Sequence, residues 1–210
     1  MTTFPLVFAS SWASGINSYA TVLVLGLAGK YGHQADVPPA LERTDVLVVV
    51  GALFVLQFVA GKIPFVDSVW DVVHTPIRPI MASAIGVLIS HQGHGSLAMA
   101  TASAALGGGT ALVSHAAKTG VRMGVNMSPE PLSNVVASLV EDGAVTGLIA
   151  LAVAHPVPAA ILAGVLLALM ILLAVVLVRS IRAFLRRRRE RRAAKAAVRA
   201  GPPRSAWTGP

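Results

Sequence analysis

The chain has 210 residues, of which 55% are hydrophobic and 12% charged, and its mean hydropathy is +0.72. Soluble domains carry about a quarter charged residues, so this composition predicts an integral membrane protein. Eleven of the seventeen Lys and Arg residues lie from Arg179 onward, which gives a tail of +10 and a body of −2. This distribution argues against a nucleic-acid-binding surface. The chain has no cysteine, which excludes disulfides, thiolate catalysis and Cys-ligated metals.

Six apolar stretches predict an all-α, polytopic transmembrane bundle of about six spans. They cover residues 4–29, 46–61, 77–90, 97–117, 132–154 and 157–181. A helix needs about 20 residues to cross roughly 30 Å of hydrocarbon. The stretch 77–90 is too short, and so is the part of 132–154 that follows Asp142, so each needs the polar segment before it to complete a span. We therefore expect the acidic residues of 67–75 and 132–142 at membrane depth.

The bundle is predicted to occupy residues 1–181, followed by an Arg-rich juxtamembrane helix over 182–200 and a disordered tail over 201–210. The positive-inside rule predicts both termini on the cytoplasmic side of the cell membrane, with loops 30–45 and 91–96 outside. Anionic lipid headgroups are the expected partners of the basic tail, and homo-oligomers are expected, whereas nucleic acid is not. The arginines expected at the headgroups are Arg182, Arg186, Arg187, Arg188, Arg189, Arg191 and Arg192.

Two pairs of segments share a spacing that suggests an internal repeat. The segment 15–18 (Gly-Ile-Asn-Ser) is matched 92 residues later by 107–110 (Gly-Gly-Gly-Thr). A second match, 67 residues apart, pairs Asp67, Asp71 and His74 with Asn134, Ser138 and Glu141. Transporters often contain inverted repeats and bind solutes where the repeats meet. The expected topology puts both members of the second pair on one side, so either one segment is re-entrant or this match is coincidence.

A helix that begins near residue 66 would carry its polar residues on one face. At positions i, i+4, i+7 and i+11 these are Asp67, Asp71, His74 and Arg78. The apolar residues Val66, Val69, Trp70 and Val73 are expected to point the other way. Pro76 and Pro79 are expected to break this helix and to leave carbonyls free to bind a ligand. The alternative is a proline kink that a neighbouring helix heals.

Glu141 and Asp142 are the most costly pair of residues in the predicted bundle. An acidic residue at the centre of a span costs roughly 2.5 to 3.5 kcal/mol on insertion scales, so the pair must be neutralised, hydrated or paired with cations. The cations available are Arg78, His74, Lys118 and Arg122. Two interpretations stay open: ion pairs that only hold helices together, or a polar site that also handles a ligand.

The glycine-rich segments allow two interpretations as well. Glycines at 15 and 107 either unwind a helix beside a ligand, together with Asn17, Ser18 and Thr110, or let two helices approach closely. Gly143 and Gly147, four residues apart, are typical of a helix-packing face. His91 and His94 lack a nearby carboxylate, so no metal site is expected. No nucleophile or nucleotide motif occurs, so neither an enzyme nor a cofactor is expected.

Four segments resemble a family of bacterial multipass membrane proteins catalogued as domain of unknown function 4126. They are Ser-Gly-Ile-Asn-Ser-Tyr-Ala at 14–20, Lys-Ile-Pro-Phe-Val-Asp-Ser-Val-Trp-Asp at 62–71, Gly-Gly-Gly-Thr at 107–110 and Ser-Pro-Glu-Pro-Leu-Ser-Asn at 128–134. The resemblance covers about residues 10–180 and implies a compact polytopic protein of the cytoplasmic membrane. It implies no substrate, and it does not extend to the basic tail.

The leading functional hypothesis is transport or channel-like permeation of a small polar or ionic solute through the bundle. The residues expected to bind the solute, an ion or protons are Asn17, Ser18, Asp67, Asp71, His74, Arg78, Thr110, Asn134, Glu141 and Asp142. Within this set, Arg78 is expected to neutralise the acids. The alternative is a non-catalytic membrane scaffold whose polar residues only join helices. A membrane enzyme that acts on lipid ranks third.

Overall fold

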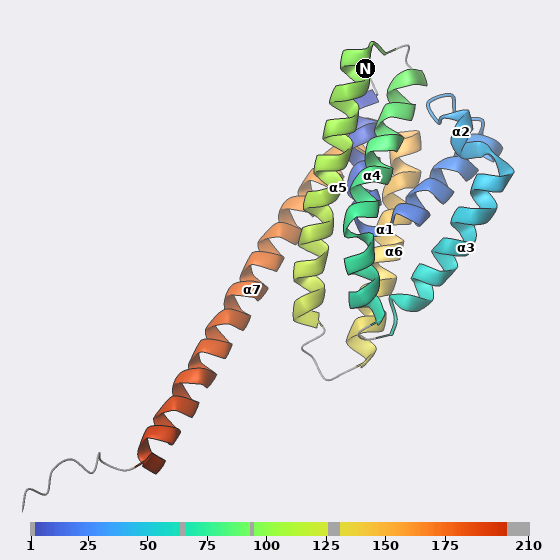
Figure 1. Cartoon of the computed structure of the whole chain (residues 1–210). Coiled ribbons are helices and arrows are strands. Elements are labelled where there is room, and N and C mark those ends of the chain that lie inside the picture. The colour runs from blue at the N-terminus through green and yellow to red at the C-terminus, as the bar shows by residue number, and fades with distance from the viewer. Residues whose placement is uncertain (1–2, 64–65, 93–94, 126–130, 201–210) are drawn as a thin grey trace, which may run out of the picture.

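The computed structural model describes residues 3–63, 66–92, 95–125 and 131–200, which form seven α-helices and no strand (Figure 1). The helices are α1 (Thr3–Gly32), α2 (Pro39–Glu42), α3 (Thr44–Ala60), α4 (Val66–Gln92), α5 (Leu97–Val125), α6 (Pro131–Ala154) and α7 (Pro156–Ala200). The predicted all-α class is confirmed. The predicted disorder of 201–210 lies outside the described residues.

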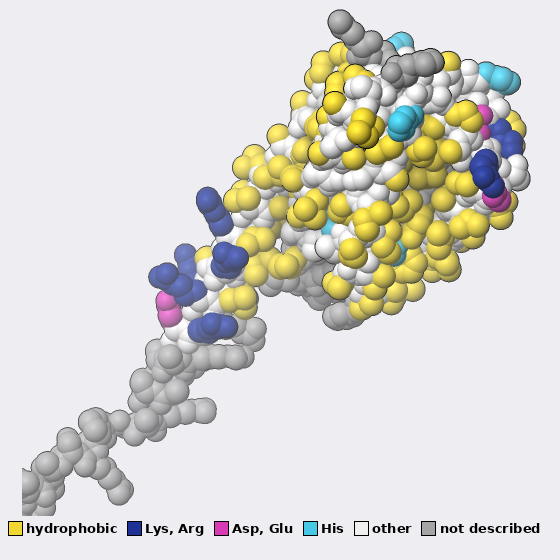
Figure 2. Space-filling view, turned by 45° about the horizontal axis from the view of Figure 1, so that its top comes forward, with side chains coloured by type: hydrophobic (Ala, Val, Ile, Leu, Met, Phe, Trp, Pro, Cys, Tyr) yellow, Lys and Arg dark blue, Asp and Glu magenta, His cyan; other side chains and the backbone are white. Residues whose placement is uncertain are grey.

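Four helices are long and apolar enough to cross a membrane. They are α4, α5, the part Leu132–Ala154 of α6 and the part Pro156–Arg187 of α7. Helix α3 is apolar but shorter, with 17 residues. Hydrophobic side chains predominate on the face of the bundle seen in Figure 2, while Lys and Arg side chains appear on α7 beyond the bundle and at the opposite edge of the bundle. The chain is therefore a polytopic membrane-protein bundle.

The polar segments complete the short spans as expected. Helix α4 begins at Val66 and α6 at Pro131, so both contain the acidic residues that precede their apolar parts. The polar face of α4 points into the bundle, because Asp67, Asp71 and Arg78 are buried while Val69 is 65% exposed. Helix α4 is thus polar inside and apolar outside, as a membrane requires.

The predicted break at the prolines of α4 is wrong. Helix α4 continues from Val66 to Gln92 with Pro76 and Pro79 inside it. The Thr75 hydroxyl donates to the Asp71 carbonyl over 3.0 Å, which keeps the turn before the prolines hydrogen-bonded. Helix α5 packs against the same stretch, and the position of a Gly108 Cβ is 3.4 Å from the Pro79 carbonyl oxygen. The helix is therefore continuous through both prolines, with α5 packed beside this stretch.

The break occurs in α1 instead, at Asn17, whose φ of −149° and ψ of 93° are not helical. The half before Asn17 runs beside α5, where Gly15 lies against Ala111. The half after Asn17 runs beside α6, since Val24 and Leu27 line one pocket with Ala150 of α6. Helix α1 thus enters the bundle, breaks at its middle and turns back, as Figure 1 shows.

Both ends of α1 lie at one end of the bundle, which we call the N-terminal end. Val7, near the start of α1, contacts the position of a Gly86 Cβ in the last third of α4. The Val37 carbonyl, just after α1, accepts a hydrogen bond of 3.2 Å from Gln92 Nε2 at the end of α4. Helix α1 is therefore re-entrant and does not cross the bundle.

The C-terminal part of α7 leaves the bundle at the opposite end, which we call the tail end (Figure 1). The structure thus differs from the predicted six spans with both termini on one side. The reason is that the stretch 4–29, long enough to cross, is divided at Asn17 into two halves that are each too short. Five helices, α3 to α7, connect the two ends of the bundle.

Glycines determine how closely α1, α4 and α5 approach. A Cβ on Gly15 would lie 2.5 Å from the Ala111 carbonyl oxygen, and one on Gly107 would lie 2.5 Å from the Ala82 carbonyl oxygen. Close packing is therefore what these glycines provide. The predicted packing face of α6 is wrong, because a Cβ on Gly143 or Gly147 would meet no described atom within 4 Å. Both glycines lie on the exposed side of α6.

Gly15→Ala and Gly143→Ala should have opposite effects on stability. The first change forces α1 away from α5 and should lower the free energy of unfolding by roughly 1–3 kcal/mol. The second should raise it by up to about 1 kcal/mol through helix propensity alone. Unfolding of the two purified variants in detergent measures both effects. Equal stability of the two variants would contradict the close approach of α1 and α5.

The re-entrant α1 gives a topology that single cysteines can test, since the chain has none of its own. Thr3→Cys and Gln34→Cys should react with a membrane-impermeant thiol reagent in intact cells. Arg187→Cys should react only after the cells are permeabilised, because the basic tail favours the cytoplasmic side. If Thr3→Cys, like Arg187→Cys, reacted only after permeabilisation, α1 would cross the membrane.

Candidate functional site

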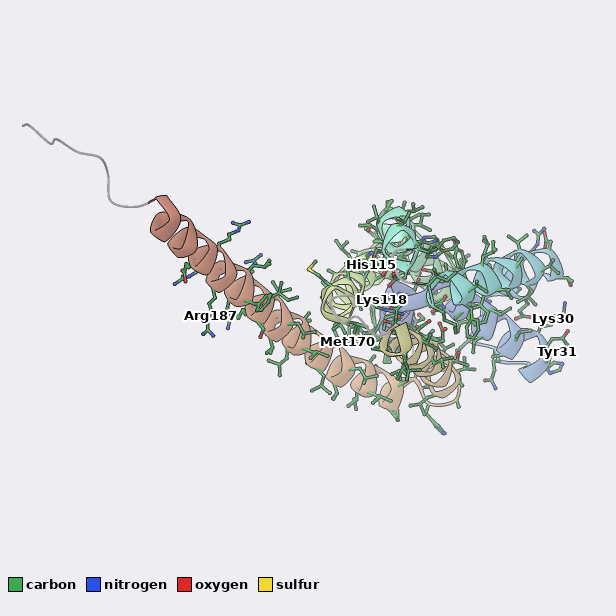
Figure 3. All side chains as sticks on the ribbon, turned by 90° about the horizontal axis from the view of Figure 1, so that it is seen from below. Lys30, Tyr31, His115, Lys118, Met170 and Arg187 are labelled. Carbon is green, nitrogen blue, oxygen red and sulfur yellow. The ribbon has the colours of Figure 1, made fainter. Side chains whose placement is uncertain are left out.

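Seven charged side chains meet beside the break in α1. The cations are Arg78 of α4 and Lys118 and Arg122 of α5, and the carboxylates are Asp67 and Asp71 of α4 and Glu141 and Asp142 of α6. We call these seven residues the charge cluster. Arg78, Lys118 and Arg122 are only 0%, 6% and 4% exposed. In Figure 3, Lys118 lies within the ring of helices, whereas Arg187 lies on α7 away from it.

The break in α1 leaves three successive carbonyls without helical partners, and side chains replace those partners. The Ala20 N–H, which would reach the Ile16 carbonyl in an unbroken helix, bonds Asn17 Oδ1 at 2.9 Å. The Ile16 carbonyl accepts from Lys118 Nζ at 3.2 Å, and the Gly15 carbonyl accepts from Arg78 Nη1 at 3.1 Å. The Ser14 carbonyl accepts from Ser18 Oγ at 2.7 Å. These bonds stabilise the broken backbone at membrane depth.

The same cations form ion pairs that join α4, α5 and α6. Arg78 Nη2 lies 2.8 Å from Asp71 Oδ1. Lys118 Nζ lies between two carboxylates, 3.4 Å from Asp71 Oδ1 and 3.3 Å from Glu141 Oε2. With the Ile16 carbonyl, Lys118 therefore has three acceptors for its three N–H groups.

Arg122 is the most extensively bonded cation of the cluster. Its Nε and Nη2 donate to the two carboxylate oxygens of Glu141 over 2.8 and 3.0 Å, which is a bidentate pair. Its Nη1 donates to Asn134 Oδ1 over 2.5 Å and lies 3.6 Å from Asp67 Oδ2. Asn134 and Asp67, which the 67-residue match pairs in the sequence, thus contact the same guanidinium. The 92-residue match is not repeated in the backbone, since α5 remains helical where α1 breaks.

Asp142 differs from the other three carboxylates. Its Oδ1 accepts from Asn17 Nδ2 at 2.9 Å, and its Oδ2 is buried without a hydrogen-bond partner. Among the described residues, no Lys or Arg nitrogen forms a salt bridge with it within 4.0 Å. The next cation is Lys62, whose ammonium donates to the Phe58 carbonyl over 3.0 Å. Burial lowers the pKa of Lys62, although the charge of Asp142 acts in the opposite direction.

Two histidines extend the polar region. His74 Nδ1 lies 2.7 Å from the Trp70 carbonyl and must donate to it, so His74 Nε2 accepts from the Tyr19 hydroxyl at 2.9 Å. His115 Nδ1 accepts from Arg78 Nη1 at 2.6 Å, which leaves Nε2 to donate to the Thr75 hydroxyl at 3.1 Å. These neighbours assign one neutral tautomer to each ring.

A cavity of about 300 Å³ between α4 and α5 reaches the charge cluster. It is lined by Ser68, Asp71, Val72, Thr75, Thr119, Arg122 and Met123. These residues belong to the first part of α4 and the last part of α5, so the cavity lies toward the tail end of the bundle. It combines three hydroxyls with one acidic and one basic group, while the apolar side chains of Val72 and Met123, 72% and 51% exposed, border its opening.

The structure brings together most of the residues expected at the site. Asn17, Asp67, Asp71, Arg78, Asn134, Glu141 and Asp142 lie in or against the charge cluster. His74 shares the buried face of α4 with Asp71 and Arg78 but bonds Tyr19 and the Trp70 carbonyl instead. Ser18 bonds only within α1, to Ser14. Thr110 is buried on α5, but the hydrogen bonds of the described residues do not join it to the cluster. The sequence names Lys118 and Arg122 only as cations available to the acids and misses His115, although their i, i+3, i+7 spacing places all three on one face of α5.

The basic tail continues α7 as one helix to Ala200. Arg182, Arg187 and Arg189 are exposed, and Arg186 pairs with Glu190 at 3.0 Å. The side chains of Arg188, Arg191 and Arg192 lie outside the described ones. None of the described tail arginines lies in the charge cluster, so the expected headgroup contacts are independent of it.

Fold and site together define a polytopic helical membrane protein with a buried charge cluster beside a broken helix. The chain belongs to the family described as "Domain of unknown function (DUF4126)", whose profile matches residues 5–176. The family resemblance of the sequence is therefore confirmed. No curated protein and no solved structure matches the chain.

Removing one cation should destabilise the bundle. Arg122→Gln leaves Glu141 and Asp67 buried with less compensation and should lower the free energy of unfolding by about 3–5 kcal/mol. Arg186→Gln, which breaks only the exposed pair with Glu190, should change it by less than about 1 kcal/mol. Chemical unfolding of both variants in detergent measures the difference. Similar losses in the two variants would show that the buried pairs contribute little.

Proposed function

We propose that this protein lets a small polar or ionic solute cross the membrane through the bundle, and that it is not an enzyme. The observation that carries the proposal is a buried charge cluster placed beside a re-entrant, broken helix. Ionisable residues inside a membrane are costly and usually serve function. Transporters commonly build their sites from broken helices near the middle of the membrane.

The contacts of each residue in the cavity and in the charge cluster indicate its role in this proposal. Asp71 and Arg122 line the cavity, so they meet the solute first. Thr75 and Thr119 add hydroxyls that can replace part of its hydration shell. Arg78 and Lys118 compensate the carboxylates and hold the broken end of α1. Glu141 connects Lys118 to Arg122, so a change at the cavity reaches α1 through one chain of contacts.

Access in this proposal is from the tail end. The cavity lies between the first part of α4 and the last part of α5. Toward the N-terminal end the first half of α1 fills the bundle, where Ser11, Ser14 and Gly15 are buried. Crossing therefore requires α1 to move, and Asn17 is the position at which it can bend.

We further propose that the protein resides in the bacterial cytoplasmic membrane with its tail end on the cytoplasmic side, and that it forms homo-oligomers. The basic residues support this orientation, since Lys62 and the described arginines of α7 lie at or beyond the tail end. Arg182, Arg187 and Arg189 are then exposed to anionic headgroups, each worth about 1 kcal/mol near the surface.

The second candidate is a non-catalytic scaffold, and one observation favours it. Arg78, Lys118 and Arg122 each bond to carboxylates or carbonyls of the protein, so the cluster can serve to join α1, α4, α5 and α6 alone. A scaffold should copurify with a fixed partner at constant stoichiometry and should conduct no solute.

Cysteine blocking in proteoliposomes tests the permeation proposal. Osmotic swelling and isotope uptake, measured with a panel of small cations, anions and zwitterions, should exceed those of empty vesicles. In Thr119→Cys, a small charged thiol reagent should block this flux, because Thr119 lines the cavity. Ser180→Cys, exposed on α7, is the matched control and should keep its flux after full labelling.

Two results would contradict the proposal. One is the absence of flux for every solute in the panel, which would favour the scaffold. The other is unchanged flux in fully labelled Thr119→Cys, which would mean that the solute avoids the cavity.

A further inference from the structure

Asp142 is the only described carboxylate of the charge cluster that has no cation within salt-bridge distance. Asp67 pairs with Arg122, Asp71 with Arg78 and Lys118, and Glu141 with Lys118 and Arg122. Asp142 has one hydrogen bond, from Asn17 Nδ2 to Oδ1, and its Oδ2 is buried without a partner. The cluster also contains four acids and three bases, so it has one negative charge in excess.

The groups that face Asp142 come from four parts of the chain. Asn17 of α1 donates a hydrogen bond, Lys118 of α5 and Lys62 between α3 and α4 are cations at longer range, and Glu141 precedes it on α6. Lys118 already has three oxygen acceptors, and Lys62 is engaged by Phe58, whose ring centroid lies 2.9 Å from its ammonium. Neither lysine therefore forms the missing ion pair.

The unpaired carboxylate of Asp142 is better suited to bind a proton than a metal ion. An unpaired carboxylate in a water-poor site is costly, and binding one proton removes the charge. A metal ion needs several oxygen ligands, and the described residues contain no group of three or more His, Asp or Glu placed to hold one. Asp142 has no ion pair with the described residues, so its protonation separates none, and the residue around the covered Oδ2 is only partly buried.

Asn17 connects Asp142 to the break in α1. Its Oδ1 caps the second half of α1 through the Ala20 N–H, while its Nδ2 donates to Asp142. The carboxylate thus lies at the N-terminus of that half-helix, where negative charge is favourable. Neutralising Asp142 weakens both the hydrogen bond and this dipole interaction, so it loosens the contact between α6 and the half-helix.

We propose that Asp142 is a proton-carrying residue and that solute movement through this protein is coupled to protons at this position. The inference rests on the proposed permeation function. A proton from water on one side forms an O–H bond at Oδ2 and converts the carboxylate into a neutral acid. The second half of α1 is then free to pivot at Asn17. The same O–H bond breaks when the proton leaves to water on the other side.

Infrared titration of the reconstituted protein tests the site itself, without any flux. The carbonyl band of a protonated buried acid should appear and disappear reversibly with pH in the wild type. Asp142→Asn should lose that band, because the amide cannot take up the proton. Asp45→Asn removes an exposed acid that pairs with Arg43 outside the cluster, and it should keep the band. A band that persists in Asp142→Asn overturns the proposal.

Asn17→Gly provides a second variant in case Asp142→Asn does not fold. Glycine is tolerated at a helix N-cap and has no side-chain group to donate to Asp142. Losing a hydrogen bond to the charged form should move the midpoint of the band by about one to two units toward higher pH. An unchanged midpoint means that the titrating acid is not Asp142 and overturns the assignment.

Proton movement tests the coupling. Vesicles loaded with a pH-sensitive dye and given a potassium diffusion potential should acidify faster with the wild type than without protein, and Asp142→Asn should reduce the rate to that of empty vesicles. If the rate of solute flux through the wild type is the same with and without a pH gradient, the coupling is overturned, whereas the permeation function stands. A titrating band with no flux of any solute or proton overturns the permeation function and, with it, the coupling.

Discussion

The break in α1 is the constraint on which the rest of the molecule depends. A chain that interrupts a helix inside a membrane must provide partners for the carbonyls it releases, because no water is there to do so. Here Ser18, Arg78 and Lys118 provide them. Burying two cations for this purpose then requires carboxylates, which α4 and α6 supply. The charge cluster is thus a consequence of the broken backbone as much as a site in its own right.

Much of this architecture could be predicted from the sequence, because it depends on local spacing. The helical character, the extension of α4 and α6 into polar segments and the inward face of Asp67, Asp71 and Arg78 all follow from periodicity and from the length of a span. The need for cationic partners of Glu141 followed from the cost of an unpaired acid in a membrane. These inferences need no knowledge of which helix lies next to which.

The remaining features depend on contacts between distant segments. Pro76 and Pro79 carry the strongest local signal for a break, yet α4 stays helical through both, while Asn17 breaks α1 with no proline near it. Asn17 is held by Asp142, which lies 125 residues away in the chain. Gly143 and Gly147 have the spacing of a packing face, but none of the described helices lies against them. Spacing within one helix predicts which residues share a face, and only the neighbouring helices decide what that face meets.

Helix α7 is longer than any bilayer requires, and this has a mechanical consequence. Its 45 residues extend over roughly 68 Å, about twice the thickness of the hydrocarbon. It touches α5 where Ala174 meets Gly120 and Leu177 meets Gly124, and beyond these contacts it leans away from the bundle. Ala159 and Ala163 near the start of α7 are fully buried, so this helix is packed into the bundle along its first part. A helix longer than the hydrocarbon adjusts its tilt to the thickness of the bilayer. A change in the tilt of α7 therefore acts on its contacts with α5, the helix that carries His115, Lys118 and Arg122.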